Sequence, residues 1–448
     1  MKYLSFFLIS FIVSITLQAQ EITGDWYGVL EVQGQKIRVV YHISKDGDNL
    51  KSTMDSPDQG VMGIPMANTT FSQDTLTISA PNMMMKYSAV LKNGELTGEY
   101  HQSGMQIPLQ LTQEEQEINR PQVPKKPYPY LKEEVTFENI KDTVNLAGTL
   151  TKPKEVKNFP TVILISGSGP QNRNEEVMGH QPFLVISDYL TRNGIAVLRY
   201  DDRGVGKSTG NFSTSNIYDF TEDAKAAVNY LRSRKDIDAS KIVLLGHSEG
   251  GVVAPLIASK DKDLGGIILL AAPGVRGDEL LLQQQEDVLG GSGMPKAKVD
   301  SIVNLNKGIY EILNTVEKKH LNNKIEEYAK KKALSTSEIS KQKAQFKNEW
   351  LYSFLTYDPT NALQQVTCPV LALNGSKDIQ VNAAQNLQAI EKNIAQGGNK
   401  NVTVKELENL NHLFQTATTG MPNEYGQIEE TISPKVLEII KDWIHANF

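Results

Sequence analysis

The chain has a single cysteine, Cys368, among its 448 residues. One cysteine excludes an intrachain disulfide and a zinc site built from paired cysteines. Cys368 begins an apolar stretch, so we expect it to be a small buried residue at the start of a strand. The His-Glu-x-x-His and calcium-loop spacings are absent as well, and neither a metal nor another cofactor is expected.

Positive charge is also scarce. The 46 Lys and Arg are outnumbered by 52 Asp and Glu, which gives a formal net charge of −6. Lysine-rich stretches such as "EKKHLNNKIEEYAKKK" contain acidic residues too and predict solvated surfaces. Because no basic patch is available to neutralise phosphates, we expect no nucleic-acid partner.

The N-terminus carries a largely apolar run from Leu4 to Leu17, with Lys2 before it and Ala19 after it. The run is shorter than the ~20 apolar residues that span a bilayer. A basic start, a short apolar run and a small residue before a polar sequence predict a signal peptide over residues 1–19. The protein is therefore expected to be periplasmic or secreted, with no stable membrane span after cleavage. The lack of disulfides favours a bacterial periplasm.

Residues 21–113 alternate apolar and polar side chains with the period of a strand. Asp-Gly and Asn-Gly pairs between these runs are typical of hairpin turns. The segment therefore predicts a small antiparallel β barrel or sandwich. Seven of the eleven methionines lie here, and we expect them to fill the core or form an apolar contact surface, with a soft-metal site as the alternative. Residues 114–130 are charged and rich in proline, which predicts an extended linker.

Residues 131–448 show a different pattern, in which apolar strands alternate with helical stretches. The strands are expected in "TVILISGSGP", "GIAVLRYDDRG", "KIVLLGHSEGG", "GIILLAAPG" and "CPVLALNGSKD", each followed by a polar turn. This alternation predicts an α/β fold, a mostly parallel sheet with helices on both faces and a site at the carboxyl ends of its strands. A helical insertion at about 275–365 is too long for a simple connection and predicts a cap over that site.

Ser248 lies in a Gly-x-Ser-x-Gly pattern between a predicted strand and a predicted helix. Such a bend forces the serine into a strained backbone conformation with its hydroxyl exposed. Gly246 and Gly250 flank it because side chains there would collide with the neighbouring strand and helix. Ser248 is therefore the expected nucleophile, and a purely structural turn is the alternative.

A serine hydroxyl needs a base that is oriented by a carboxylate. In enzymes that place their serine in such a Gly-x-Ser-x-Gly turn, the acid follows the serine along the chain and the base follows the acid. Asp378 follows a predicted strand, and His412 follows the next one, so we expect them to be the acid and the base. His320 falls in the predicted cap and His445 in the final helix. His247, next to the serine, is expected to point away from it.

The oxyanion of an acyl-transfer intermediate needs two backbone N–H donors. We expect one to be the amide of Glu249, directly after the nucleophile. The other should come from the glycine-rich loop "ISGSGPQNRN", where Ser168 is the first choice and Gly169 the alternative.

Six motifs together resemble a known family. "SGSGPQNRNE", "GHQPF", "LRYDDRGVGKSTG", "GHSEGG", "LNGSKDIQV" and "NLNHLF", in this order, resemble secreted bacterial carboxylesterases of the α/β-hydrolase superfamily and are similar to two-domain acetyl esterases of the EstD type. The resemblance implies an α/β-hydrolase fold, a triad of Ser248, Asp378 and His412, and hydrolysis of short-chain acyl esters.

The resemblance also implies that Arg173, Asn174 and His180 lie near the mouth of the site. The chain departs from another branch of lipases and esterases because it lacks their His-Gly-Gly-Gly loop. That departure leaves the second oxyanion donor open.

Three functions are compatible with these patterns. The first is a serine carboxylesterase acting on a small ester, either free or displayed on a polymer that the β domain binds. A peptidase, aminopeptidase or acylaminoacyl hydrolase with the same triad is the second, because a triad alone does not separate esters from amides. The third is a binding protein whose hydrolase domain is inert.

Overall fold

The computed structural model describes residues 22–32, 35–57, 61–115, 119–154 and 156–448. The chain forms two compact units that divide between residues 117 and 118. The predicted signal peptide lies outside the described residues. Within them, no helix combines the length and apolar character needed to cross a membrane.

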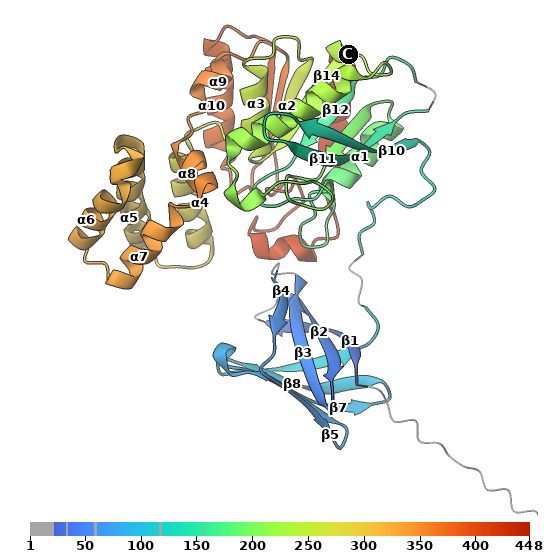
Figure 1. Ribbon diagram of the computed structural model, residues 1–448, viewed down its shortest axis with the longest axis vertical. Helices are drawn as coiled ribbons and strands as arrows, with labels where there is room; N and C mark the ends of the chain where they lie inside the picture. Colours follow the sequence, from blue (N-terminus) through green and yellow to red (C-terminus); the bar gives the residue numbers. More distant parts are fainter. Residues whose placement is uncertain (1–21, 33–34, 58–60, 116–118, 155) are drawn as a thin grey trace, which may run out of the picture. The chain divides into compact units, whose positions relative to one another are not determined.

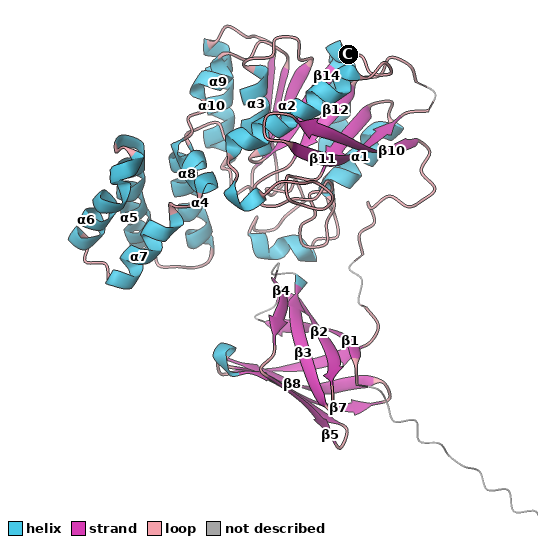
Figure 2. Ribbon diagram, in the orientation of Figure 1, coloured by secondary structure: helices cyan, strands magenta, loops and turns pink. Residues whose placement is uncertain are grey.

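The N-terminal unit is a single antiparallel sheet of nine strands (Figure 2). Its strands are β1 (Gly24–Val32), β2 (Gln35–Asp46), β3 (Asn49–Ser56), β4 (Val61–Pro65), β5 (Asn68–Ser72), β6 (Thr75–Ala80), β7 (Met85–Lys92), β8 (Glu95–Gln102) and β9 (Met105–Thr112). Their order in the sheet is β4-β3-β2-β1-β9-β8-β7-β6-β5. A hydrogen bond of 2.7 Å between Ser52 Oγ and Thr69 Oγ1 joins β3 to β5, so the sheet curls into a half-barrel. The prediction of a small antiparallel β domain is confirmed.

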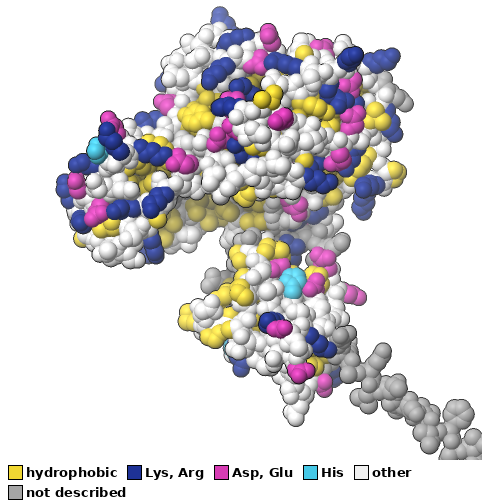
Figure 3. Space-filling view, in the orientation of Figure 1, with side chains coloured by type: hydrophobic (Ala, Val, Ile, Leu, Met, Phe, Trp, Pro, Cys, Tyr) yellow, Lys and Arg dark blue, Asp and Glu magenta, His cyan; other side chains and the backbone are white. Residues whose placement is uncertain are grey.

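The core of this unit comes from the inward-facing residues of the alternating pattern. Trp26 is buried and donates its indole N–H to Ile22 O at 2.8 Å. Tyr41 and Tyr87 are fully buried and stack with their ring centroids 5.7 Å apart. Among the described methionines, Met54 and Met85 are buried in this core, whereas Met62, Met84 and Met105 are exposed. Figure 3 shows apolar side chains gathered along one side of this unit.

The second unit is built on an eight-stranded mixed sheet. Its strands are β10 (Leu131–Asn139), β11 (Val144–Lys152), β12 (Thr161–Ile165), β13 (Ala196–Tyr200), β14 (Ile242–His247), β15 (Gly266–Leu270), β16 (Val370–Gly375) and β17 (Val402–Leu407). The order is β10-β11-β13-β12-β14-β15-β16-β17, and all neighbours from β13 onward are parallel. The pairs β10–β11 and β11–β13 are antiparallel.

Helices cover both faces of this sheet, as Figure 1 shows. They are α1 (Pro182–Arg192), α2 (Ile217–Ser233), α3 (Gly250–Ala258), α9 (Thr360–Gln364), α10 (Ala383–Gln396) and α11 (Pro434–Asn447). Strand β14 shows why both faces are apolar: Ile242 and Leu244 pack with α2, α3 and α10, whereas Val243 and Leu245 pack with α1 and α11. The predicted α/β class is confirmed.

The helical insertion consists of α4 (Gly277–Gly291), α5 (Lys296–Thr315), α6 (Leu321–Lys331), α7 (Thr336–Gln345) and α8 (Glu349–Thr356). It has a core of its own, which includes Ile309, Leu313 and Ile325. In Figure 1, α5, α6 and α7 stand away from the sheet, whereas α4 and α8 lie beside it. Figure 3 shows lysine and arginine interspersed with acidic side chains over this insertion.

The predicted linker does not behave as one extended segment. The division between the units falls inside it, and Arg120 and Gln122 pack on the second unit. Arg120 donates to the carbonyl oxygens of Ile428 at 2.6 Å and Met178 at 3.1 Å. The later part of the linker is therefore a piece of the second unit.

Candidate active site

Ser248 occupies the sharp turn between β14 and α3, with a φ of +51°. This is the left-handed region that residues other than glycine rarely adopt. Its neighbours leave no room for side chains: a Cβ at Gly246 would lie 2.1 Å from Gly250 O, and a Cβ at Gly250 would lie 2.1 Å from Ile165 O. The two glycines let the strand, the turn and the helix approach closely enough to hold this bend.

Asp378 and His412 are brought together from the loops after β16 and β17. Asp378 Oδ2 lies 2.8 Å from His412 Nδ1, and both side chains are buried. The other carboxylate oxygen accepts the amides of Gln380 and Val381 at 2.9 Å each, which fixes its orientation. A proton on Nδ1 leaves the Nε2 lone pair of His412 available as a base.

Ser248 and His412 line the same cavity, which has a volume of about 370 Å³. Its walls combine the elbow, the loops at the carboxyl ends of the strands, and helices α4 and α8 of the insertion. The lining is mostly apolar, with glutamines as neutral polar groups. Its residues are Gly167, Ser168, Gln171, Glu175, Val177, Met178, His247, Ser248, Pro273, Leu280, Leu281, Gln284, Trp350, Phe354, Gln380, Val381, His412, Leu413, Pro422 and Tyr425.

The amides expected to hold an oxyanion are those of Glu249 and of the loop after β12. In the described part of the chain, neither the Ser168 amide nor the Glu249 amide donates to another backbone or side-chain acceptor. Ser168 lines the cavity that contains Ser248, whereas Gly169 is not among its lining residues. The geometry thus favours Ser168 over Gly169 as the partner of Glu249.

The side chain of Glu249 makes a contact that the sequence did not suggest. Glu249 is 3% exposed, and its carboxyl accepts the indole N–H of Trp350 at 2.8 Å. Burial raises the pKa of Glu249 to about 7, against the opposing effect of hydrogen bonds from Trp350 and Ser168. Trp350 belongs to α8, so this bond ties the insertion to the elbow.

The three residues expected at the mouth of the site are not among those that line the cavity. Arg173 pairs with Asp201 at 2.7 Å, and this ion pair holds the loop after β12 against the end of β13. Asn174 Oδ1 accepts from Arg199. His180 is fully buried, and its Nε2 lies 2.8 Å from Tyr425 O, behind the cavity wall. All three shape the loops around the cavity from outside it.

The remaining histidines of this unit also have defined places. His445 Nε2 bonds to Asn193 O in an exposed position, and His320 is exposed in the insertion. His247 does not extend into solvent: it is buried and pairs with Glu175 at 2.9 Å. Sequence patterns did not indicate Glu175, Trp350 or this pairing, because each partner comes from a distant part of the chain.

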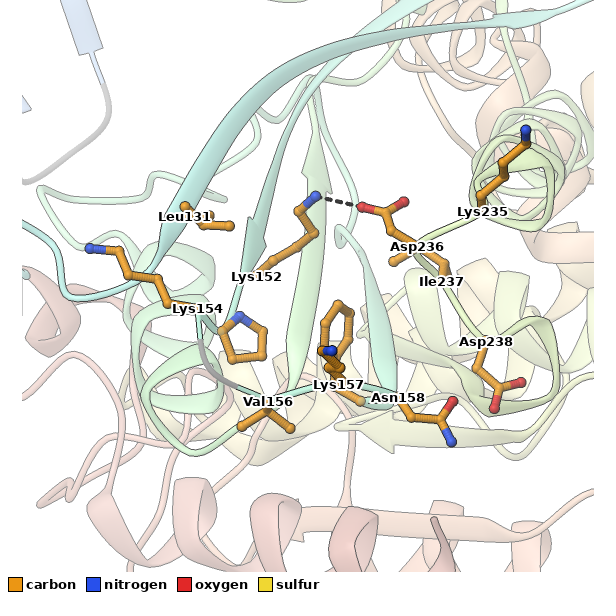
Figure 4. Close-up of a pocket in the computed structure, with 12 residues that line it drawn as sticks. Leu131, Lys152, Lys154, Val156, Lys157, Asn158, Lys235, Asp236, Ile237 and Asp238 are labelled. Atoms are coloured by element: carbon orange, nitrogen blue, oxygen red, sulfur yellow. Dashed lines mark hydrogen bonds and ion pairs between the residues drawn. The ribbon is translucent and has the colours of Figure 1, made fainter.

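A second cavity, of about 480 Å³, lies at the opposite end of β12 (Figure 4). Phe159, just before β12, and Lys152, at the end of β11, contribute to it, and Lys152 Nζ is paired with Asp236 at 2.5 Å. In open α/β sheets the site forms beyond the carboxyl ends of the parallel strands. This cavity is at their amino ends and contains none of the expected catalytic residues.

The second unit has a mixed sheet covered by helices, a serine with a left-handed backbone conformation at the turn after a central strand, and a buried Asp–His pair. These features define the α/β-hydrolase class. Within that class, residues 181–416, slightly more than half of the chain, match the family model described as serine aminopeptidase S33. The chain belongs to this family and is an esterase-type serine hydrolase.

Relatives span esterases and proteins without a described activity. The chain is 28% identical over 311 residues to esterase EstD of Thermotoga maritima, covering 69% of this chain and 68% of the relative. It is 30% identical over 130 residues to the uncharacterized protein YfhR of Salmonella typhimurium, covering 28% of this chain and 40% of that one. The solved structure of the Pyrococcus furiosus esterase Pf2001 matches with a TM-score of 0.43 and 17% identity, over 73% of this chain and 96% of that one.

Proposed function

We propose that the protein is a serine carboxylesterase that hydrolyses short-chain, acetyl-like esters. The observation that carries the proposal is the 2.8 Å contact between Asp378 and His412 at a cavity that Ser248 also lines. A nucleophile, a base and an orienting carboxylate at one cavity are the requirements of acyl transfer through a covalent intermediate.

The proposed reaction has two halves. His412 Nε2 takes the proton of Ser248 Oγ as that oxygen attacks the ester carbonyl, and the amides of Glu249 and Ser168 stabilise the oxyanion. The intermediate expels the alcohol, which receives the proton from His412, and leaves an acyl-serine ester. Water, deprotonated by His412, then attacks this ester, and the acid and free Ser248 are released.

The walls of the cavity favour a small, uncharged substrate. A volume of about 370 Å³ is near the lower end of the roughly 300–1,000 Å³ of small-molecule sites. Apart from His412, the described lining residues with acidic or basic character near neutral pH are Glu175 and His247, which are paired with each other. Among these lining residues, none therefore offers an unpaired carboxylate for a free ammonium group.

The same observation weighs against an aminopeptidase. The acidic residues of the insertion considered for amine binding are occupied elsewhere: Glu326 pairs with Lys330 and Lys343, and Glu327 pairs with Lys324. Glu249, the acidic residue beside the nucleophile, is bonded to Trp350. These contacts support an ester over an N-terminal amino acid as the substrate.

Substitution of Ser248 tests the proposal. Ser248→Ala should lower kcat on p-nitrophenyl acetate by a factor on the order of 10⁶, because the nucleophile is lost while the fold is kept. The wild-type protein should hydrolyse this ester far faster than alanine p-nitroanilide. Ser292→Ala, at an exposed serine after α4, is the matched control and should behave as wild type.

Two outcomes would count against the proposal. Substantial turnover by Ser248→Ala would remove the assigned nucleophile. A kcat/KM for the aminoacyl anilide equal to or above that for the acetyl ester would replace the esterase by a peptidase with the same triad.

The N-terminal unit and the N-terminal apolar run support two further parts of the proposal. We propose that the protein is exported to the periplasm or beyond the cell, because residues 1–19 have the order of charge and apolarity of a signal peptide. We also propose that the β unit binds the polymer from which ester groups are removed. Its exposed apolar residues, Met62, Met84 and Met105 among them, offer a contact surface.

A further inference from the structure

A second carboxylate–histidine pair lies directly behind the proposed triad. His247 ends β14 and immediately precedes Ser248. Its Nδ1 lies 2.9 Å from Glu175 Oε1, and its Nε2 lies 3.0 Å from the carbonyl oxygen of His412. His247 is 7% exposed and Glu175 is 4% exposed, so both contacts are shielded from water.

Glu175 reaches this position from the loop between β12 and α1. Its backbone has a φ of +52°, an uncommon conformation for a glutamate, and its amide bonds to Asn172 O at 2.8 Å. The oxygen that contacts His247 also accepts the amide of Gly167 at 2.7 Å. Gly167 precedes Ser168, whose amide is a proposed oxyanion donor.

The two contacts of His247 set how many protons the pair needs for both to be hydrogen bonds. A neutral imidazole has one N–H, yet both ring nitrogens of His247 face oxygen atoms. Both contacts can be hydrogen bonds only when the pair holds an additional proton, which an imidazolium form of His247 would supply. Although burial alone lowers it, the pKa of His247 is raised by the charge and hydrogen bond of Glu175.

The surroundings of His247 contain few other charges. Phe183 and Ile186 from α1, Leu270 from β15, and Leu413 form an apolar shell around it. The described titratable groups that face it are Glu175, His412 and Asp378. The rings of His247 and His412 are 4.9 Å apart between centroids, at 45°.

We propose that Glu175 and His247 are a positioning pair that sets the distance between the oxyanion loop, the nucleophile and the catalytic histidine. Glu175 holds the loop through Gly167, His247 is continuous with Ser248, and its Nε2 holds the main chain of His412. This inference rests on the triad proposed above.

Substitutions at Glu175 separate positioning from mere packing. Glu175→Ala removes both contacts and should lower kcat on p-nitrophenyl acetate about 100-fold with little change in KM, since the loss falls on the transition state. Glu175→Gln keeps an oxygen that can accept both the Gly167 amide and a proton on His247 Nδ1, but it leaves no proton on Nε2 for the His412 carbonyl, so it should recover only part of this kcat.

Substitutions at His247 test the two contacts one at a time. Asn places its amide near the position of Nδ1 and keeps a donor for Glu175, whereas Gln places its amide near Nε2 and keeps a donor for the His412 carbonyl. His247→Asn and His247→Gln should each have a lower kcat than wild type, because each keeps only one of the two contacts. Glu176→Gln, at the exposed neighbour of Glu175, is the control and should leave kcat and KM unchanged.

The experiment distinguishes failure of this inference from failure of the triad. Glu175→Ala with a kcat within twofold of wild type, or Glu175→Gln with a kcat no higher than that of Glu175→Ala, would overturn the positioning pair. Ser248→Ala, measured alongside, addresses the triad itself: its turnover reports on the nucleophile whatever the Glu175 variants do. Circular dichroism of each variant shows that a lowered kcat comes from a folded protein.

Discussion

At the scale of single residues, the proposed chemistry depends on which nitrogen of His412 carries the proton. Asp378 accepts from Nδ1 at 2.8 Å, and its second oxygen is held by two backbone amides. An asparagine would keep the oxygen that faces those amides and would turn its NH₂ toward Nδ1. The imidazole would then carry its proton on Nε2 and could not accept one from Ser248.

Asp378→Asn should therefore lower kcat by about 10⁴ at neutral pH without unfolding the protein, as the wrong tautomer does in other triads. The measurement is kcat on p-nitrophenyl acetate, with thermal unfolding as a check. Asp358→Asn, at an exposed aspartate after α8, is the matched control. A kcat close to wild type for Asp378→Asn would mean that this carboxylate does not orient the base.

The raised pKa of Glu249 predicts that the stability of the protein depends on pH. Burial raises its pKa to about 7 in the folded protein, whereas an unfolded glutamate ionises near pH 4.3. Between these values the unfolded chain has lost the proton and the folded one retains it, so stability falls as pH rises. The loss should be complete above about pH 7.

Glu249→Gln keeps an oxygen for the Trp350 indole and has no carboxyl to ionise. Relative to this variant, the wild type should lose about 3 kcal/mol of unfolding free energy between pH 4.5 and 8, because each pH unit between the two pKa values costs ~1.4 kcal/mol. Urea unfolding of both proteins at the two pH values measures the difference. Parallel pH profiles for the two proteins would show that Glu249 ionises normally.

Sequence patterns locate a candidate residue when a local motif surrounds it. The bend at Ser248 and the polar turns that hold Asp378 and His412 are visible because each follows its own apolar strand. Glu175 and Glu176 show the limit: they are adjacent and chemically identical, yet one is buried and the other is exposed. Only the fold, which brings His247 against the loop after β12, distinguishes them.

At the scale of elements, the site depends on how closely α3 approaches β12 and β14. Gly250→Ala would place a Cβ 2.1 Å from Ile165 O and 2.9 Å from Ser166 O, both backbone atoms. Helix α3 must then move away from the sheet. Because Gly250 follows Glu249, the amide of Glu249, the proposed oxyanion donor, moves with it.

We expect Gly250→Ala to destabilise the protein by about 1–3 kcal/mol, as overpacking typically does, and to lower kcat. Gly290→Ala in α4 is the control, because a Cβ there meets nothing within 4 Å. It should be neutral or stabilising by up to about 1 kcal/mol, since alanine favours a helix interior more than glycine. Equal effects of the two substitutions on thermal unfolding would contradict this account of the elbow.

Helices and strands whose apolar residues recur with a clear period could be predicted from the sequence. Their packing against distant parts of the chain could not. The five parallel strands quoted from the sequence correspond to β12, β13, β14, β15 and β16. The insertion was recognisable by its length and helical pattern. The hydrogen bond from Trp350 to Glu249 that attaches the insertion could not be predicted, because hydrophobic periodicity does not show which acceptor an indole N–H will reach.

At the scale of the whole molecule, the boundary between the units separates a β unit with its own core from a catalytic unit that includes part of the predicted linker. The contacts of Arg120 attach that part of the linker to the second unit. Its guanidinium donates to the carbonyls of Gly426 at 2.7 Å, Ile428 at 2.6 Å and Met178 at 3.1 Å. Met178 and the adjoining Tyr425 line the cavity.

Gln122 adds a second attachment to the same wall. Its Oε1 accepts the amides of Thr431 at 2.6 Å and Ile432 at 3.1 Å, and its Nε2 donates to Ile432 O at 2.7 Å. The two side chains form a strap: Arg120 joins the loop that carries Tyr425 to the loop that carries Met178, and Gln122 anchors the same segment to Thr431 and Ile432. A proline-rich composition predicted an extended chain and gave no sign of these bonds.

Two truncations separate the roles of the β unit and the strap. A protein of residues 118–448 should keep kcat/KM on p-nitrophenyl acetate within about threefold of the full chain, because it retains Arg120 and Gln122. On an insoluble acetylated polysaccharide it should lose activity if the β unit binds the polymer. A protein of residues 131–448 loses the strap, with several hydrogen bonds of about 1 kcal/mol each, and should melt at lower temperature and hydrolyse even the soluble ester at least tenfold less efficiently.

A point variant of the full chain serves as a control for the comparison of the two truncated proteins. Arg120→Ala should reproduce the loss on the soluble ester while leaving the β unit in place, so the effect of the strap is measured apart from that of the β unit. Equal activity of the 118–448 and 131–448 proteins on the soluble ester would show that the cavity wall holds without the strap. Equal activity of the full chain and the 118–448 protein on the polysaccharide would remove polymer binding from the role of the β unit, because the catalytic unit alone would then reach the same esters.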